Sequence, residues 1–129
     1  MSLEFNWAAK SDYVRIEVSG DFSLEAILPM CDRFFEVTAG AGQEALLVDA
    51  RSVTGREPTM AERYQWAVRV AAAQARHQPR IRVALLGHEP LIHPERFGEI
   101  VVTNRGGTIR TFTEEAAALE WLLGKAPGA

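Results

Sequence analysis

Apolar and polar residues alternate in two stretches near the start of the chain. Leu3, Phe5 and Trp7 alternate with polar neighbours in the first stretch, and residues 13–18 repeat the pattern after a turn at 11–12. A period of two residues is typical of a strand with one buried face. Because the gap between the stretches is short, the pattern predicts an antiparallel hairpin.

Helical and strand-like patterns then alternate along the rest of the chain. We expect helices over about 23–40, 59–77, 94–106 and 114–123. We expect strands over about 44–49, 81–86 and 108–112. Ser23, Thr59 and Thr113 are the expected N-terminal caps, and Pro94 suits the first turn of the third helix. Pro29 falls inside the first helix and should kink or loosen it.

The helix predicted over 59–77 has two apolar sides. The side expected to face the core carries Met60, Tyr64, Ala67, Val68, Ala71 and Ala75. Trp66, Val70 and Ala73 lie together on a second side, flanked by Arg63 and His77. Because tryptophan and arginine are enriched in protein contacts, Arg63, Trp66 and Val70 are a candidate interaction surface. The pattern is equally consistent with a neighbouring helix that covers Trp66.

The order of the predicted elements is ββαβαβαβα. Strands that alternate with helices predict parallel strands joined by right-handed crossovers. Arg15, Arg82 and Arg110 interrupt the apolar strand patterns, whereas a parallel sheet covered on both faces is apolar throughout. We therefore expect an α/β fold: a five-stranded mixed sheet, its N-terminal strand antiparallel, with all four helices on one face. The polar face, which also carries Tyr13 and Glu17, would be a solvated surface, a dimer face or the floor of a ligand site.

Composition narrows the choice of partners. The chain has 129 residues, of which 47% are hydrophobic, and a net charge of −3 with a pI of about 5.6. This size predicts a single domain, which we place at 1–124 with a loose tail at 125–129. The acidic balance argues against nucleic acid, because phosphate binding needs a basic face. Neither a membrane span nor a secretory signal is recognisable, so we expect a cytoplasmic protein.

Three segments resemble a known family: LLVDARSVTG after the third predicted strand, RVALLG at the fourth, and NRGGTIRTFTEEAAALEWL at the end. With the element order, they make the chain similar to the SpoIIAA-like fold of STAS domains, the anti-sigma factor antagonists. The likeness is greatest to a related family of small uncharacterised bacterial proteins (STAS/SEC14-like), and it covers nearly the whole chain. It implies the βα superhelix of that fold and a regulatory protein without enzymatic activity.

The resemblance also implies a candidate phosphorylation site. Antagonist STAS domains carry an acidic residue and a phosphorylatable serine at the start of the helix after the third strand. Asp49 and Val53 match the start of that motif, and Glu57, Pro58 and Thr59 then stand where the family has Asp-Ser-Ser. Proline thus replaces the usual phosphoacceptor, and a switch in this chain would act at Thr59.

Two loops carry polar residues at the expected carboxyl ends of neighbouring parallel strands, where open α/β sheets bind ligands. One loop spans 49–59 and leads into a helix N-terminus, and the other, GHEPLIHPERF, spans 87–97. Arginines and free N–H groups at a helix start favour an anion. A small anionic or amphipathic ligand would be bound by Arg51, Arg56, Thr59, His88 and His93. In the alternative interpretation, these residues satisfy turn backbone, cap the helix or face solvent.

Metal binding and catalysis have little support in the sequence. His88, Glu89 and His93 do not have the HExxH spacing, Pro90 prevents a continuous helix through them, and no second cluster completes a ligand set. The single cysteine, Cys31, lies on the apolar side of the first helix, where an inert thiol is expected. No serine sits in a nucleophile elbow. We therefore expect no enzyme activity, no metal and no cofactor.

The sequence thus predicts a non-enzymatic SpoIIAA-like binding or regulatory module. The leading hypothesis is contact with a protein partner, or with a second copy of the chain, through Arg63, Trp66 and Val70. The alternatives are a small-ligand site at the carboxyl ends of the third and fourth strands, and a phosphorylation switch at Thr59.

Overall fold

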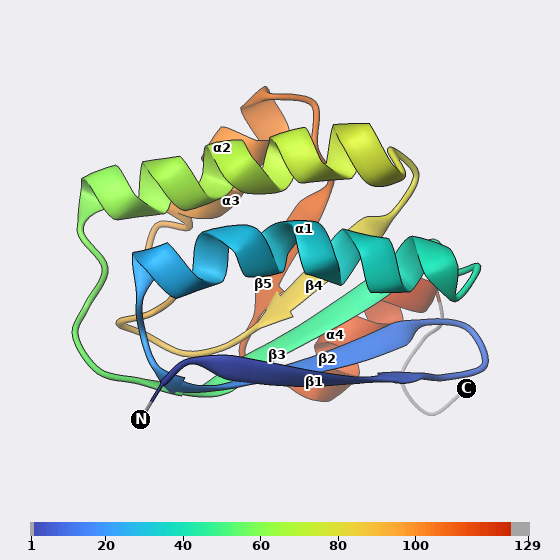
Figure 1. Cartoon of the computed structure of the whole chain (residues 1–129), viewed down its shortest axis with the longest axis horizontal. Coiled ribbons are helices and arrows are strands. Elements are labelled where there is room, and N and C mark those ends of the chain that lie inside the picture. The colour runs from blue at the N-terminus through green and yellow to red at the C-terminus, as the bar shows by residue number, and fades with distance from the viewer. Residues whose placement is uncertain (1, 125–129) are drawn as a thin grey trace.

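The computed structural model describes residues 2–124 and places them in one sheet with helices on both sides (Figure 1). The tail predicted at 125–129 lies outside the described residues. Along the chain, the elements are β1 (Glu4–Ala9), β2 (Val14–Asp21), α1 (Leu24–Gly40), β3 (Ala45–Thr54), α2 (Met60–His77), β4 (Arg82–Leu86), α3 (Phe97–Asn104), β5 (Ile109–Phe112) and α4 (Glu115–Leu123). This is the order predicted from the sequence.

The strands form one five-stranded sheet in the order β1-β2-β3-β4-β5. β1 pairs with β2 in the antiparallel sense, and the other neighbouring pairs are parallel. The mixed sheet predicted from the alternating patterns is therefore confirmed. β3 extends beyond β4 at the carboxyl end: its pairing with β4 ends at Asp49, whereas its pairing with β2 continues to Thr54.

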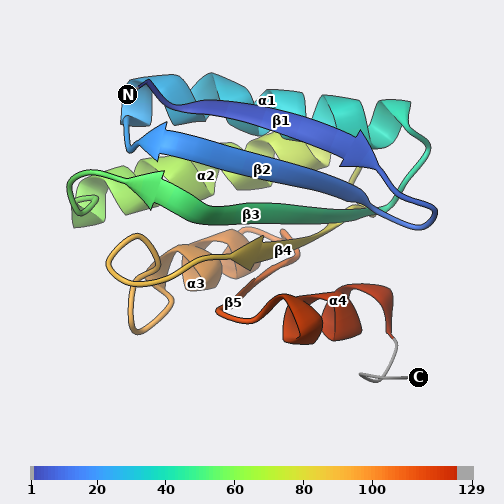
Figure 2. The same cartoon turned by 90° about the horizontal axis from the view of Figure 1, so that it is seen from below.

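The helices cover the two faces of the sheet unequally. α1, α2 and α3 lie on one face, and α4 lies against the other (Figures 1 and 2). The expectation that all four helices share one face is therefore wrong for α4. The physical reason is a second set of buried apolar residues that joins β3 and β4 to α4: Ala45, Leu47, Ala84, Leu86, Ala118 and Leu122.

The polar face of the sheet is partly covered for the same reason. Arg82 lies over the ring of Trp121, with its guanidinium carbon 4.4 Å from the ring centroid. It also donates a hydrogen bond of 2.7 Å to the Trp121 carbonyl oxygen. An arginine in a strand can thus face a helix when its aliphatic part packs and its charge finds acceptors.

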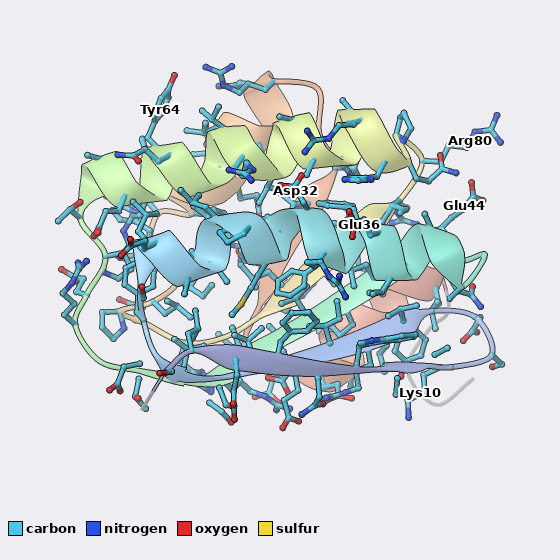
Figure 3. All side chains as sticks on the ribbon, in the orientation of Figure 1. Lys10, Asp32, Glu36, Glu44, Tyr64 and Arg80 are labelled. Carbon is cyan, nitrogen blue, oxygen red and sulfur yellow. The ribbon has the colours of Figure 1, made fainter. Side chains whose placement is uncertain are left out.

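α2 buries part of the predicted side, at Ala67 and Ala71, together with the second apolar side. Its buried residues are Arg63, Ala67, Val70, Ala71, Ala73 and Gln74. Met60 and Tyr64, which were expected in the core, are 48% and 45% exposed, and Tyr64 points away from the sheet (Figure 3). Ala67, Ala71 and Ala73 face the core, where their small side chains let α2 pack close to its neighbours. The larger side chains of Met60 and Tyr64 remain outside.

The helix starts agree only in part with the predicted caps. The hydroxyl of Ser23 accepts from the Ala26 N–H at 3.3 Å, and α1 is continuous through Pro29. α3 begins at Phe97, after a turn, and not at Pro94. Glu114 occupies the cap position of α4 without a side-chain hydrogen bond, in place of Thr113. None of the described helices is long and apolar enough to cross a membrane.

Candidate ligand-binding cavity

A cavity of about 120 Å³ lies between the sheet and α1, α2 and α3, toward the carboxyl ends of β3 and β4. Its wall is almost entirely apolar and is supplied by every element around it, including Val18, Val48, Cys31, Phe35, Trp66 and Val70. Protein interiors rarely leave spaces larger than a water molecule. An apolar space of this size at this edge of the sheet is therefore a candidate binding site.

The strands beside the cavity end at different points. β4 stops at Leu86, while β3 continues beside β2, so the corner next to β4 is filled by the following loop. That loop turns back tightly: a Cβ on Gly87 would lie 3.2 Å from Cγ1 of Ile92. Leu91 and Ile92 then line the cavity. The loop over 87–97, predicted to lie at a ligand site, thus forms one wall of the cavity.

Trp66 lines the cavity beside α3 and lies against Gly98. A Cβ on Gly98 would lie 2.9 Å from Cζ3 of Trp66, so the indole ring rests directly on the α3 backbone. Arg63 and Val70 are buried, with 8% and 5% exposed. The interaction surface predicted at Arg63, Trp66 and Val70 is therefore wrong as an exposed surface, because α3 lies against Trp66 and the loop after β4 contacts Arg63.

Arg63 ties α2 to the loop that follows β4. Its two terminal nitrogens donate to the carbonyl oxygens of Leu91 at 2.7 Å and of Pro90 at 2.6 Å. Both acceptors are neutral, and no carboxylate in residues 2–124 forms an ion pair with Arg63. A buried guanidinium normally has an acidic partner, so this side chain brings uncompensated positive charge to the wall of the cavity.

The start of α2 is fixed by a capping box. The Thr59 hydroxyl accepts from the Glu62 N–H at 3.1 Å, and the Glu62 carboxylate accepts from the Thr59 N–H at 2.9 Å. Arg56 adds two hydrogen bonds of 2.6 Å to the same carboxylate. The bonds from Arg56, followed by the one from the Thr59 backbone, lower the pKa of Glu62 to about 2. Thr59 therefore caps the helix, as the alternative interpretation held, and its phosphorylation stays a prediction.

Arg51 lies on the other face of the sheet, away from the cavity. It donates to Asp49 through Nε at 3.0 Å and through a terminal nitrogen at 2.9 Å, and it reaches Glu115 of α4 at 3.0 Å. Arg15 contacts the same two carboxylates at 2.6 and 3.0 Å. Burial alone would raise the pKa of Asp49, but the bonds from Arg51 and Arg15 outweigh it and hold that pKa at about 2. This cluster joins α4 to the sheet.

The two histidines of the second loop are separated. His93 lines the cavity, and its Nδ1 accepts from the Glu95 N–H at 3.0 Å. His88 is exposed and does not line the cavity. Of the residues predicted to bind a ligand, His93 thus lines the cavity, Arg56 and Thr59 reach it only through Glu62, and Arg51 lies elsewhere. Within residues 2–124 no group of histidine, cysteine and acidic side chains is placed to hold a metal ion.

Arg96 was not singled out from the sequence, yet it lines the cavity and is exposed to solvent. It precedes α3 in a left-handed backbone conformation, with φ 57° and ψ 43°. Such a conformation is strained for a residue with a Cβ. The Arg96 side chain has no hydrogen bond or ion pair with any other residue of 2–124. In the sequence, the only indication of a role for Arg96 was its position in the loop GHEPLIHPERF, residues 87–97.

Ion pairs join α1 to α2 above the cavity. Asp32 of α1 lies between α1 and α2 (Figure 3) and accepts from Arg69 at 2.6 and 2.9 Å, and also from Arg76. Burial acts to raise the pKa of Asp32, but the bonds from Arg69 and Arg76 give a net lowering. These ion pairs keep the two helices in place over the cavity.

Cys31 lines the cavity from α1. Burial raises the pKa of its thiol to about 12, so the group is protonated at neutral pH. A protonated, buried thiol is a weak nucleophile and acts here as part of the apolar wall.

No protein-family model matches the sequence, and a sequence search of characterised proteins gives no match. Solved structures do match the fold. An anti-sigma factor antagonist from Mycobacterium paratuberculosis superimposes with a TM-score of 0.63 at 13% sequence identity, over 95% of each chain. An uncharacterised DUF3478-family protein with a SpoIIAA-like fold, from Shewanella loihica PV-4, superimposes with a TM-score of 0.51 at 20% identity, over 93% of each chain.

The chain has a SpoIIAA-like fold. The resemblance drawn from the three sequence segments is therefore confirmed at the level of fold. At these identities the likeness concerns the SpoIIAA-like fold itself, so function has to be argued from the site.

Proposed function

We propose that the protein is a non-enzymatic SpoIIAA-like binding module that takes a small, largely apolar molecule into the cavity beneath α1, α2 and α3. The observation that supports this proposal is the cavity itself: about 120 Å³ of space walled almost entirely by apolar side chains. Engineered apolar cavities of about 150 Å³ bind benzene, so the space suits a ligand of about six carbons. Its place at the carboxyl ends of the strands is where open α/β sheets bind ligands.

Absence of a reactive set supports a binding role over an enzymatic one. Among residues 2–124, the cavity wall has no thiolate and no paired nucleophile and base, since Cys31 is protonated and His93 accepts from a backbone N–H. The acidic residues Glu62 and Glu99 are both held by hydrogen bonds within the protein. A wall of this kind binds through shape and burial.

The expected affinity follows from the buried surface. Each buried methylene is worth about 0.8 kcal/mol, so a six-carbon chain gives roughly 4–5 kcal/mol. That free energy corresponds to a Kd of about 1 mM or slightly below. A simple probe such as hexan-1-ol should therefore bind in this range.

Calorimetric titration of hexan-1-ol tests the proposal. Ala50 is buried on β3 and lines the cavity, so Ala50→Leu places a large side chain inside it and should abolish binding. Ala72 is an exposed residue of α2, so Ala72→Leu is a matched control that should bind like the wild type. Equal binding by the two variants, or no binding by the wild type, would contradict the proposal.

A second candidate function is a regulatory contact with a protein. It is favoured by the fold shared with an anti-sigma factor antagonist and by the exposure of Met60 and Tyr64 on the outer side of α2. Light scattering at increasing concentration, on the wild type and on a Met60→Ser/Tyr64→Ser variant, tests self-association. A wild type that stays monomeric at high concentration would exclude a homodimer through this side of α2.

A further inference from the structure

The charges around the cavity are unevenly compensated. Arg63 is 8% exposed and lines the cavity, and its terminal nitrogens contact only the neutral carbonyl oxygens of Pro90 and Leu91 among the described residues. A guanidinium has five N–H donors, so donors remain after these two bonds. A buried cation without an anionic partner is costly, and an anionic ligand group would relieve that cost.

The acidic residues that line the cavity do not supply this partner. Glu62 is bound by both terminal nitrogens of Arg56 at 2.6 Å and by the Thr59 N–H, so its charge is already compensated. Glu99 accepts from the backbone N–H of Thr111 at 2.7 Å and from its hydroxyl at 3.1 Å. These bonds hold the Glu99 carboxylate at β5.

Arg96 adds a second positive charge where the cavity meets solvent. It is exposed, lines the cavity, and has a side chain without a partner in residues 2–124. With the Arg56–Glu62 pair neutral, the remaining fixed charges at the cavity are those of Arg63, Arg96 and Glu99, which leaves an excess of one positive charge. Strained backbone at a ligand site is often retained because it positions the side chain, and the left-handed conformation of Arg96 fits this description.

We propose that the ligand is a small monocarboxylate, with an aliphatic chain or single ring of about six carbons in the cavity and its carboxylate beside Arg63 and Arg96. This inference rests on the proposed function and adds the charge and size of the ligand. The apolar wall argues against a nucleotide, and a cavity of about 120 Å³ is too small for the chains of a membrane lipid. A carboxylate matches the planar, two-pronged donor geometry of a guanidinium.

Calorimetric titration of hexanoate, hexan-1-ol and hexylamine at pH 7 tests the charge of the ligand with one apolar body. Hydrogen bonds to charged groups favour the anion, so hexanoate should bind about tenfold more tightly than hexan-1-ol, and hexylamine more weakly than both. Equal or tighter binding of hexan-1-ol would overturn the carboxylate and leave the cavity as a binding site. Absence of binding by all three compounds would overturn the proposed function as well.

An Arg96→Asn variant tests which residue carries the selectivity. Asparagine tolerates the left-handed conformation and has no charge, and Arg96 is in an exposed loop, so the variant should fold. The preference for hexanoate over hexan-1-ol should fall severalfold in this variant. Arg80→Asn, at an exposed arginine on the loop before β4 that does not line the cavity, is the matched control and should keep the full preference (Figure 3). An unchanged preference in Arg96→Asn would overturn the role of Arg96.

Discussion

Replacing Asp49 with asparagine removes the central charge of the cluster that joins α4 to the sheet. Asp49 is 5% exposed, and its carboxylate accepts hydrogen bonds from Arg15 at 2.6 Å and from the Arg51 side chain at 2.9 and 3.0 Å. These bonds hold its pKa at about 2, against an ordinary value of 3.8. The lowered pKa means that the charged form stabilises the folded state.

The size of the effect follows from this pKa. One pKa unit corresponds to about 1.4 kcal/mol, so the fall from 3.8 to about 2 is worth up to about 2.4 kcal/mol. The side chains of Arg51 and Glu115 are 36% and 34% exposed, and solvent screens their part of the interaction. We therefore expect Asp49→Asn to lower the free energy of unfolding by about 1–2 kcal/mol at pH 7.

The loss should also depend on pH in a defined direction. Because the folded-state pKa is below the unfolded one, the stabilisation is complete above about pH 4 and disappears as the pH falls through about 2. Urea denaturation of the wild type and of Asp49→Asn at pH 7, 5 and 3 measures the difference directly. About half of the difference should be lost at pH 3. A difference that is equal at pH 7 and pH 3, or that is absent at pH 7, would refute the reasoning.

Three further predictions concern the cavity and its rim. Ala50→Leu fills empty space in the cavity and should raise the free energy of unfolding by about 1 kcal/mol. Ala84→Leu adds the same atoms to the packed layer against α4 and should lower that free energy by about 1–3 kcal/mol, and urea denaturation of both variants measures the difference. Thr59→Ala removes the cap of α2 and should lower the same free energy by about 1 kcal/mol, measured by thermal and urea denaturation. Arg96→Gly relieves the backbone strain of the left-handed conformation and should raise the free energy of unfolding by about 0.5–1 kcal/mol in the same assays. It should also weaken hexanoate binding. A loss of stability would show that Arg96 has a structural role instead.

The apolar patterns predicted the five strands and their order along the chain. β3, however, continues to Thr54, five residues past its predicted end at 49, and Trp7, expected on the buried side of β1, is 46% exposed. Val14, Ile16 and Val18 are all buried on one face, as a period of two requires. The face taken by the last helix was not predictable in the same way. Arg82 suggested a solvated face, but its aliphatic part and charge are both accommodated by α4. A local pattern does not show whether a charged residue will meet solvent or the backbone of a distant helix.

The sequence predicted the position of the candidate site, but not most of the residues that line it. The loop that contains His93 was expected at the carboxyl end of a strand, and it does form a wall of the cavity. Arg51 was expected in the same site, but it pairs with Asp49 and Glu115, and Glu115 is remote in the sequence. Arg63 was assigned to a surface because a helical wheel does not show which distant segment will cover it. The cavity itself arises from the absence of packing atoms, which leaves no mark in a pattern of apolar residues.

Methyl NMR during a titration with hexanoate tests the central claim most directly, because it shows both binding and its location. Val48 and Val70 line the cavity, whereas Leu47 and Leu122 pack on the opposite face of the sheet. We predict shifts of the Val48 and Val70 methyl signals that saturate with hexanoate, while the signals of Leu47 and Leu122 stay in place. Signals of Val48 and Val70 that do not move, or equal shifts on both faces of the sheet, would contradict the account.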